Sequence, residues 1–155
     1  MAEGINMVWG GLNEMRHKFD ELIVKADLAA KQAVTDGGHL IERRAKQKAP
    51  VLTGTLRRSI HVDSVTKLGV GRWQSITGPS VIYAKMRELG TSYLPDGVLK
   101  PVNASILSWV GPDGMRVFAR SVKQVGHPYM RPAFDESIDA IHEIYRLSFE
   151  KAWEM

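Results

Sequence analysis

The sequence predicts an α+β protein in which a long N-terminal helix, a small antiparallel sheet and a C-terminal helix follow one another along the chain. Two segments, residues 8–48 and 132–154, place apolar side chains at helical intervals of three and four residues. The region between them alternates apolar with polar residues and contains repeated glycine and proline turns. Helices that flank a block of strands in this order are typical of the α+β class.

Length and composition favour a single domain over residues 1–155, helical over 1–48, mainly strands and loops over 50–125 and helical over 132–154. The chain has no cysteine, which excludes a disulfide scaffold and a thiolate metal site. No apolar run approaches the roughly 20 residues that a membrane span needs. The first residues also lack the pattern of a secretory signal. We therefore expect a protein that is made in a cytoplasm and has no membrane partner.

The first helical segment carries its apolar side chains on one face. They step by three and four residues, at Leu12, Met15, Phe19, Leu22, Ala26, Ala29 and Ala33. Gly37 and Gly38 interrupt this pattern, and each glycine destabilises a helix interior by about 1 kcal/mol relative to alanine. The segment is therefore either two helices or one long helix with a weak point. Pro50 ends it, because the residue before a proline is disfavoured in the helical conformation.

The region after Pro50 is expected to begin with a turn and two strands. The turn lies at residues 53–55 and leads directly into a strand near 59–65, where apolar and polar side chains alternate. A second strand is expected at 67–76, and Gly78-Pro79 is a turn signal after it.

A second pair of strands is expected further along the chain. Residues 81–89 are ambiguous, and residues 92–104 have the composition of a loop. The apolar segment 106–110 and the alternating segment 116–122 flank Gly-Pro-Asp-Gly at 111–114, which is a strong hairpin turn.

The C-terminal helix has the clearest pattern. Pro132 suits the first turn of a helix, where a missing N–H costs nothing. One stripe of apolar side chains follows, at Phe134, Ile138, Ile141, Tyr145 and Ala152. Three acids, Asp135, Glu136 and Asp139, lie near its start, where the helix dipole favours negative charge.

Charge is unevenly distributed along the chain. Residues 39–72 hold eight basic side chains and two acidic ones, whereas residues 131–155 hold three basic and six acidic ones. The basic segment indicates either nucleic acid or an acidic partner, and a second copy of the chain offers such an acidic segment. The candidate side chains for an interface or for a DNA-facing surface are Arg43, Arg44, Arg57, Arg58, Lys67 and Arg72.

Enzyme signatures are absent from the sequence. It contains no phosphate-binding P-loop, no dinucleotide fingerprint, no HExxH and no GxSxG. The five histidines are scattered, without the spacing and nearby carboxylate that a metal site needs. We therefore predict that the protein is not an enzyme and has no catalytic, metal-binding or cofactor-binding residues.

Three short blocks stand out from this background. The first ends the long helix and opens the strand region, with Ala49, Pro50, Thr53, Gly54, Leu56, Ser59 and Ile60. The second consists of Tyr83, Ala84, Glu88, Gly90 and Thr91. The third opens the last helix with Arg131, Pro132 and Ala133, after the pair Tyr129-Met130.

In this order the blocks resemble the neck or tail-completion family of long-tailed phages, the small head-tail joining proteins to which the minor tail protein Z of lambda is related. Phe-Leu is usual in that family where Tyr129-Met130 stands here, and the exchange keeps the aromatic and apolar character. The resemblance covers residues from about 40 to 135, and the first forty residues carry no signature of the family.

The resemblance implies an α+β fold and a structural role in the virion, at the junction of head and tail. Members of the family assemble as rings that complete the tail, or join it to the head connector, around the DNA channel. The implied partners are further copies of the chain, the connector or head-closure protein, and the tail terminator or tube protein. DNA would pass through without sequence-specific contacts, and no cofactor is implied. A tail terminator that caps the tube is the nearest alternative.

A free nucleic-acid-binding module is the second alternative, based on the basic segment. That segment lacks the interleaved aromatic residues of a single-strand binder and the spacing of a helix-turn-helix. The blocks also have simpler interpretations. Pro50 and Gly54 are common turn-forming residues, Glu88 could be a solvated side chain at the end of a strand, and Arg57 and Arg58 could be solvated or paired.

Overall fold

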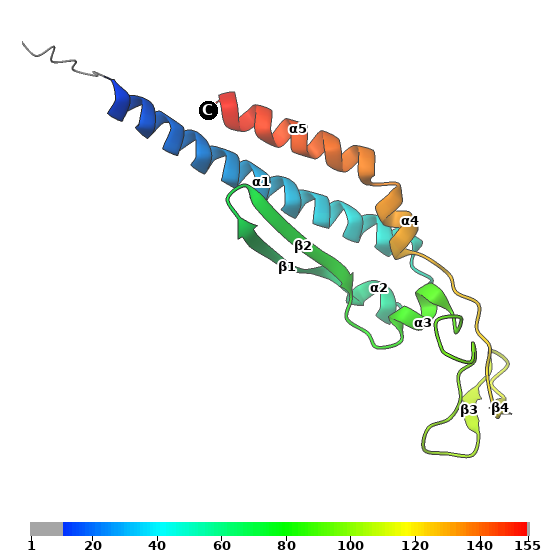
Figure 1. Ribbon diagram of the computed structural model, residues 1–155. Helices are drawn as coiled ribbons and strands as arrows, with labels where there is room; N and C mark the ends of the chain where they lie inside the picture. The colour runs from blue at the N-terminus through cyan, green and yellow to red at the C-terminus, as the bar shows by residue number, and fades with distance from the viewer. Residues whose placement is uncertain (1–10, 155) are drawn as a thin grey trace, which may run out of the picture.

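One helix of 37 residues, α1 (Leu12–Lys48), runs along most of the molecule and supports the other elements. The structure is a computed structural model that describes residues 11–154. The helix expected over residues 1–10 lies outside the described residues. Helix α5 packs along one side of α1 and the strands β1 and β2 along the other, so the body is a thin, elongated stack of layers (Figure 1). The α+β class expected from the sequence is confirmed.

Helix α1 continues through the glycine pair without a break. A Cβ on Gly37 would lie 3.6 Å from Ile141 Cγ1 of α5, and one on Gly38 would lie 2.7 Å from Ser75 Oγ of β2. The glycines therefore mark points at which α5 and the sheet approach α1 closely. This tertiary packing outweighs the low helix propensity of glycine, so the segment is one helix and not two.

The strands β1 (Ile60–Gly69) and β2 (Arg72–Pro79) form an antiparallel hairpin, with Ile60 opposite Pro79 and a bulge between Val62 and Ser64. The first strand is longer than expected, because the chain reverses at Gly71, whose φ of +65° suits a tight turn. The expected Gly78-Pro79 turn is wrong, since both residues belong to β2. A proline is tolerated there because both strands of a two-stranded sheet are edge strands.

Two short helices occupy positions where the sequence pattern predicted other structure or none. Helix α2 (Thr55–Ser59) lies between the expected turn and the first strand, which begins only at Ile60. Gly54 precedes α2 with a φ of +75°, and its carbonyl oxygen accepts the N–H of Arg58 at 3.0 Å. The ambiguous segment contains helix α3 (Ala84–Leu89), which Gly90 ends with a φ of +68°. Stretches this short are too brief for the helical period to appear.

The second hairpin is a separate sheet of its own, so the expected single small sheet is two sheets. Strands β3 (Leu107–Val110) and β4 (Arg116–Ala119) pair in the expected antiparallel way. The return strand is shorter than predicted and stops before Val122, which instead pairs with Leu99 in an isolated bridge. This hairpin projects from the end of the molecule opposite to the C-terminus of α5 (Figure 1).

The C-terminal helix is divided into α4 (Met130–Asp135) and α5 (Ile138–Glu154), so the expected continuous helix over 132–154 is wrong at Glu136 and Ser137. Ser137 is fully buried, and its hydroxyl donates to the carbonyl oxygen of Ala133 at 2.6 Å. The guanidinium of Arg44 in α1 donates to the carbonyl oxygen of Glu136. In a continuous helix these backbone carbonyl oxygens would accept N–H groups of the next turn. At the break the side chains of Arg44 and Ser137 bind them instead, which stabilises it.

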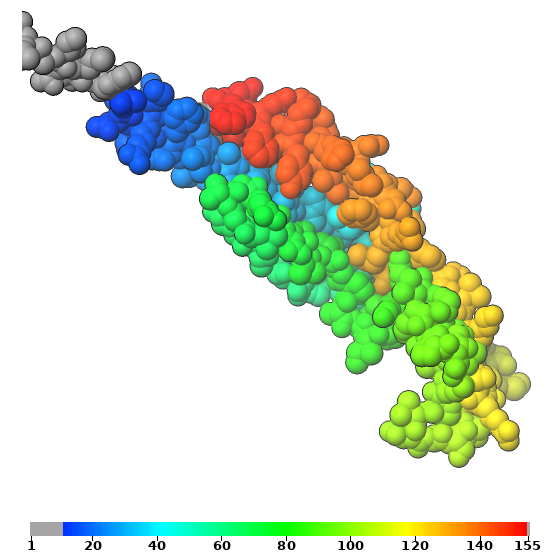
Figure 2. Space-filling model, viewed as in Figure 1, coloured from blue at the N-terminus to red at the C-terminus, as the bar shows by residue number. Residues whose placement is uncertain are grey.

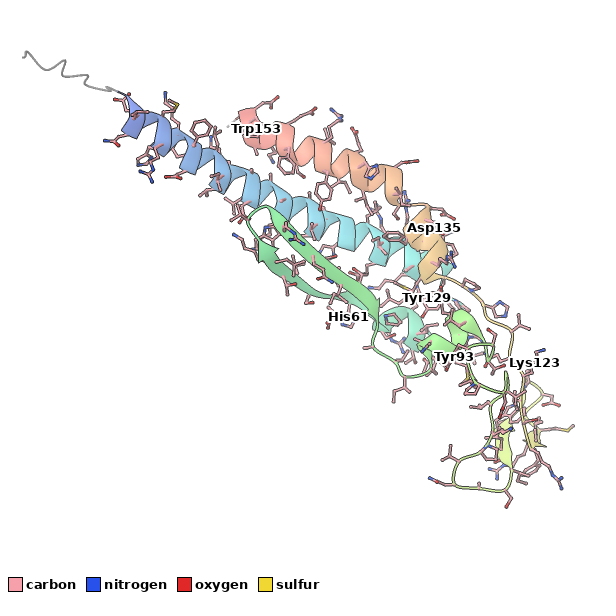
Figure 3. All side chains as sticks on the ribbon, in the orientation of Figure 1. His61, Tyr93, Lys123, Tyr129, Asp135 and Trp153 are labelled. Carbon is pink, nitrogen blue, oxygen red and sulfur yellow. The ribbon has the colours of Figure 1, made fainter. Side chains whose placement is uncertain are left out.

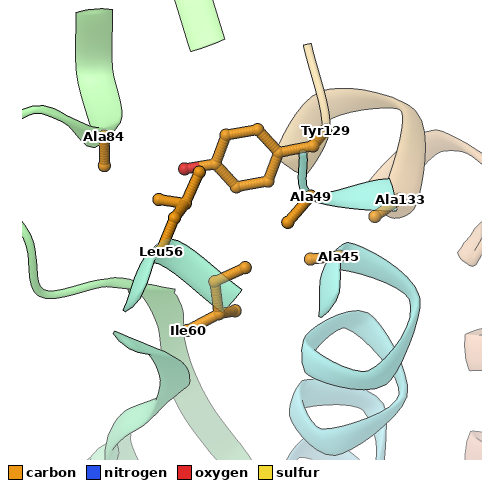
Figure 4. Close-up of a cluster of buried hydrophobic side chains, with 7 residues drawn as sticks. All are labelled: Ala45, Ala49, Leu56, Ile60, Ala84, Tyr129 and Ala133. Atoms are coloured by element: carbon orange, nitrogen blue, oxygen red, sulfur yellow. The ribbon is translucent and has the colours of Figure 1, made fainter. Parts of the chain in front are cut away.

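The main hydrophobic cluster lies where the C-terminal end of α1 meets α2, α3 and α4 (Figure 4). We call this cluster the motif junction, and it consists of Ala45, Ala49, Leu56, Ile60, Ala84, Tyr129 and Ala133. No residue of α5 is fully buried. Over the described range, no helix combines the length and the apolar character that crossing a membrane requires.

Candidate functional site

The three sequence blocks meet in space at the motif junction. Five of its seven residues match the family pattern of the blocks: Ala49, Leu56, Ile60, Ala84 and Ala133. Small alanines on α1, α3 and α4 allow the backbones to approach one another, and the larger side chains of Leu56, Ile60 and Tyr129 fill the space between them (Figure 4). These motif residues therefore build the fold and are not exposed for contact.

Glu88 connects the second block to the third. Its carboxylate accepts the backbone N–H groups of Tyr129 at 2.7 Å, Met130 at 3.0 Å and Arg131 at 3.0 Å. These N–H groups at the start of α4 have no carbonyl partner within the helix, and a carboxylate there also interacts favourably with the helix dipole. The interpretation of Glu88 as a solvated side chain is therefore wrong.

The residues after Glu88 cross the chain that leads to α4 at very short range. A Cβ on Gly90 would lie 2.5 Å from the backbone nitrogen of Gly126 and still closer to the carbonyl oxygen of Gln124. Next to this crossing, the buried hydroxyl of Thr91 donates to the carbonyl oxygen of Gly97 at 2.8 Å and accepts the N–H of Gln124 at 3.1 Å. Gly90 and Thr91 are therefore required by a backbone crossing and by a buried polar contact.

The remaining motif residues surround the junction. Pro50 follows the end of α1, and Ser59 donates from its hydroxyl to the carbonyl oxygen of Leu56 at 2.7 Å. Pro132 lies in the first turn of α4, as expected, and the exposed Arg131 side chain lies 4.0 Å from Asp135.

Thr53 and Tyr83 line a hollow of about 310 Å³ beside the junction, together with Pro50, Leu52, Leu56 and Arg87. We call this the motif hollow. The guanidinium of Arg58 lies next to Gly54 at its edge.

Two of the candidate basic residues, Arg44 and Lys67, form contacts within the chain, and so does Lys48, which lies near Arg44 on α1. Arg44 binds the carbonyl oxygen of Glu136 and, at 3.2 Å, the hydroxyl of Ser137. Lys48 lies 2.7 Å from the carboxylate of Glu136. Part of the charge complement between segments 39–72 and 131–155 therefore holds α1 against α4 and α5 inside one molecule.

Lys67 also pairs within the chain, with Asp27 of α1 at 2.6 Å. The same carboxylate accepts the N–H of Gly71 at 2.9 Å and the indole N–H of Trp73 at 3.2 Å. The hydrogen bonds from Lys67 and from Gly71 hold the pKa of Asp27 below its usual range. Asp27 thus fixes the tip of the β1–β2 hairpin on α1, a role that no sequence pattern indicated.

The other four candidates, Arg43, Arg57, Arg58 and Arg72, are exposed. Arg57 and Arg58 belong to the short helix α2, just before the first strand. Arg72 lies at the other end of the hairpin, roughly 30 Å away for a strand of ten residues. The six candidates therefore do not form one basic patch.

Tyr129, which stands where phenylalanine is usual in the resembled family, is the central residue of the motif junction. It is fully buried, and its hydroxyl has no hydrogen-bond partner among the described residues. Burial and the nearby Glu88 raise its pKa to about 12. Tyr129 fills the centre of the motif junction as an aromatic ring whose hydroxyl is not used there (Figures 3 and 4).

Apolar side chains remain exposed at both ends of the molecule. The first turns of α1 expose Leu12, Met15 and Phe19, each at least half accessible, in the stripe expected to face a core. At the opposite end, Met115 and Phe118 of the second hairpin are more than half accessible. Figure 2 shows how far these two ends extend from the middle of the body. Both ends therefore leave large apolar side chains accessible to solvent.

Comparison with known proteins assigns residues 13–90, just over half of the chain, to the family HK97-gp10_like, described as "Bacteriophage HK97-gp10, putative tail-component". The assigned region contains the first sequence block and the second up to Gly90, where it ends, one residue before Thr91. No curated protein and no solved structure matches the chain.

Proposed function

The chain belongs to the HK97-gp10-like family of structural bacteriophage tail components, and on that premise we propose that it forms a ring that completes the tail or joins it to the head connector. The family resemblance inferred from the sequence blocks is thereby confirmed, and the protein is a component of the virion. The ring, its position at the head-tail junction and its partners are the proposal. The role requires no catalytic step.

The observation that carries the proposal is the amount of apolar surface that one copy leaves uncovered. Among the described residues, seven of the eleven buried hydrophobic residues are alanines, whereas 28 large hydrophobic side chains are exposed. The accessible surface is 11810 Å², compared with about 7,800 Å² for a compact monomer of this mass. An isolated hairpin such as β3–β4 is also only marginally stable without a partner layer. The chain is therefore built to be covered by neighbours.

The elongated body suits contacts with several neighbours at once. Copies arranged side by side would cover one another's flanks, and the two exposed ends would remain for other proteins. We assign these ends to the connector or head-closure protein on one side and to the tail terminator or tube protein on the other. A ring of this kind leaves a central channel through which DNA passes.

The exposed arginines are compatible with that channel but do not define a DNA-binding module. Arg57 and Arg58 lie far from Arg72, and Lys67 is paired with Asp27. A lumen that touches sliding DNA needs a mild positive charge and no sequence-specific contacts. A free nucleic-acid-binding module would instead shift DNA in a gel at low salt, with an affinity that falls steeply as salt rises.

Deletion of the gene from its phage, followed by electron microscopy of the lysate, tests the proposal. We expect full heads and separate tails that join when purified protein is added. Tails of abnormal length would instead favour the terminator alternative, and joined, infectious particles without the protein would contradict both. Imaging of the neck in complete virions then locates the ring and shows whether Arg57, Arg58 and Arg72 face the channel.

A further inference from the structure

Helix α5 presents an acidic face to solvent. Its four acidic residues share the side that points away from α1 and are all exposed: Asp139, Glu143, Glu150 and Glu154. Only Arg146 offsets them on that face, through its contacts with Glu143 and Glu150. Trp153 lies beside Glu154 near the end of the helix and is 56% exposed (Figure 3). An exposed tryptophan between carboxylates is an unusual surface for a single soluble chain.

The motif hollow has the opposite character. Segments 50–60 and 80–90, which surround it, contain four basic residues and a single acid. That acid is Glu88, whose carboxylate already accepts three N–H groups at the start of α4. Arg57 and Arg58 are exposed, and Arg87 lines the hollow itself. Leu52 at the hollow is 97% exposed, so an apolar surface accompanies the positive charge.

These two surfaces cannot meet within one molecule. The C-terminal end of α5 lies beside the first half of α1, whereas α2 and α3 lie near the other end of α1 (Figure 1). Helix α5 and the β1–β2 hairpin also pack against different sides of α1. The C-terminal part of the acidic face and the motif hollow therefore lie near opposite ends of α1 (Figure 1).

We propose that the C-terminal part of α5 from a second copy docks on the motif hollow, with Trp153 in the hollow and Glu150 and Glu154 facing Arg57, Arg58 and Arg87. The inference rests on the proposed ring and names the contact that would build it. Charge complementarity orients the two copies, and tryptophan and arginine are the residues that most often dominate binding energy. The contact joins different surfaces of two identical copies, and such head-to-tail contacts close into a ring when the rotation permits.

Cysteine cross-linking in the assembled virion tests this contact, and the chain contains no cysteine of its own. We expect phage carrying Leu52→Cys and Trp153→Cys in the same chain to yield a ladder of disulfide-linked oligomers after oxidation. Phage carrying only one of these substitutions should yield monomers. If the double variant is present in joined particles and stays monomeric, the contact is wrong and the proposed function stands. If particles join without the protein, the proposed function itself fails.

Charge reversal gives a second readout. Arg57→Glu with Arg58→Glu should lower the yield of joined particles by about tenfold or more, and Glu150→Arg with Glu154→Arg should do the same. Combining the two pairs should restore much of the yield. The control pair Lys18→Glu with Lys123→Glu makes the same charge change at two exposed residues away from the hollow and should have little effect. Equal losses of joined particles in all pairs would show that α5 does not bind the hollow. A combined variant that does not restore the yield would show the same, and the hollow would then bind another phage protein or DNA.

Discussion

The carboxylate of Glu88 accepts the backbone N–H of Tyr129 at 2.7 Å, across a sequence separation of 41 residues. The same carboxylate accepts the next two N–H groups of α4, so one side chain at the end of α3 determines where α4 begins. Because the backbone of Tyr129 is held in this way, its ring is placed between α1, α2 and α3 (Figure 4). The motif junction therefore depends on a polar contact as well as on apolar packing.

Replacing Glu88 by alanine should destabilise the protein by about 1.5–3 kcal/mol, the usual contribution of hydrogen bonds to a charged group. Glu88→Gln keeps one acceptor oxygen and should cost less. Thermal unfolding followed by circular dichroism measures both, with Asp20→Asn as a control that removes an exposed carboxylate from α1. Equal melting temperatures for Glu88→Ala and the control would show that the cap contributes nothing to folding.

Gly90→Ala should prevent correct folding, whereas Gly97→Ala should be tolerated. Both glycines have a positive φ, 68° and 64°, so the conformational strain of about 1 kcal/mol is common to the two variants. Only at Gly90 does the new Cβ collide with backbone atoms of the crossing chain, because nothing lies within 4 Å of a Cβ at Gly97. Soluble yield and melting temperature distinguish the two effects, and similar values for both variants would contradict the tight crossing.

Tyr129→Phe should preserve or raise stability, since it removes a buried hydroxyl that lacks a partner within residues 11–154. Tyr129→Ala removes the ring from the centre of the junction and should cost about 3–5 kcal/mol. Denaturant unfolding of the two variants separates the ring from its hydroxyl. A large loss in Tyr129→Phe would reveal a bonded hydroxyl and overturn this account.

Acid should loosen the β1–β2 hairpin from α1. The pKa of Asp27 is lowered in the folded protein, so its contribution to stability is complete above the ordinary value of 3.8 and is lost as pH falls through the lower folded value. Trp73 donates to this carboxylate, so tryptophan fluorescence should report the change. Asp27→Asn should remove this acid-dependent step, and an identical acid titration in both proteins would exclude Asp27 as its source.

Arg44→Ala should destabilise the protein, and Arg43→Ala should not. The two arginines are neighbours on α1, but only Arg44 binds the carbonyl oxygen of Glu136 and the hydroxyl of Ser137. We expect a loss of about 1–3 kcal/mol for Arg44→Ala, because a polar group at the break between α4 and α5 loses its partner. Melting temperatures of the two purified monomers test this, since the effect requires no assembly.

Local sequence signals were enough to predict the main elements of the fold. Helical spacing, Pro50 and the hairpin turns are local signals, and from them the long first helix, the strand region and the C-terminal helical region follow correctly. The three blocks were identified from their residues and their order, and the family resemblance drawn from them is confirmed. Helix α2 escaped prediction because five residues are too few for a helical period to appear, and the break at Ser137 because its partner Arg44 is distant in sequence.

By itself the sequence determined the α+β class, the family and the motif residues, because periodicity, turn chemistry and motif order depend on residues that are close together in the sequence. Only the tertiary structure decided what those residues do. Glu88 proves to be the cap of α4 and not a surface acid, and Gly37 and Gly38 prove to be the positions where α5 and the sheet each pack closely against α1. The tertiary structure also distinguishes the basic residues from one another: Arg44 and Lys67 have partners within the chain, whereas Arg57 and Arg58 stay exposed. The physical reason is that burial and hydrogen-bond partners are set by segments far apart in the chain, and no local pattern encodes which segments meet.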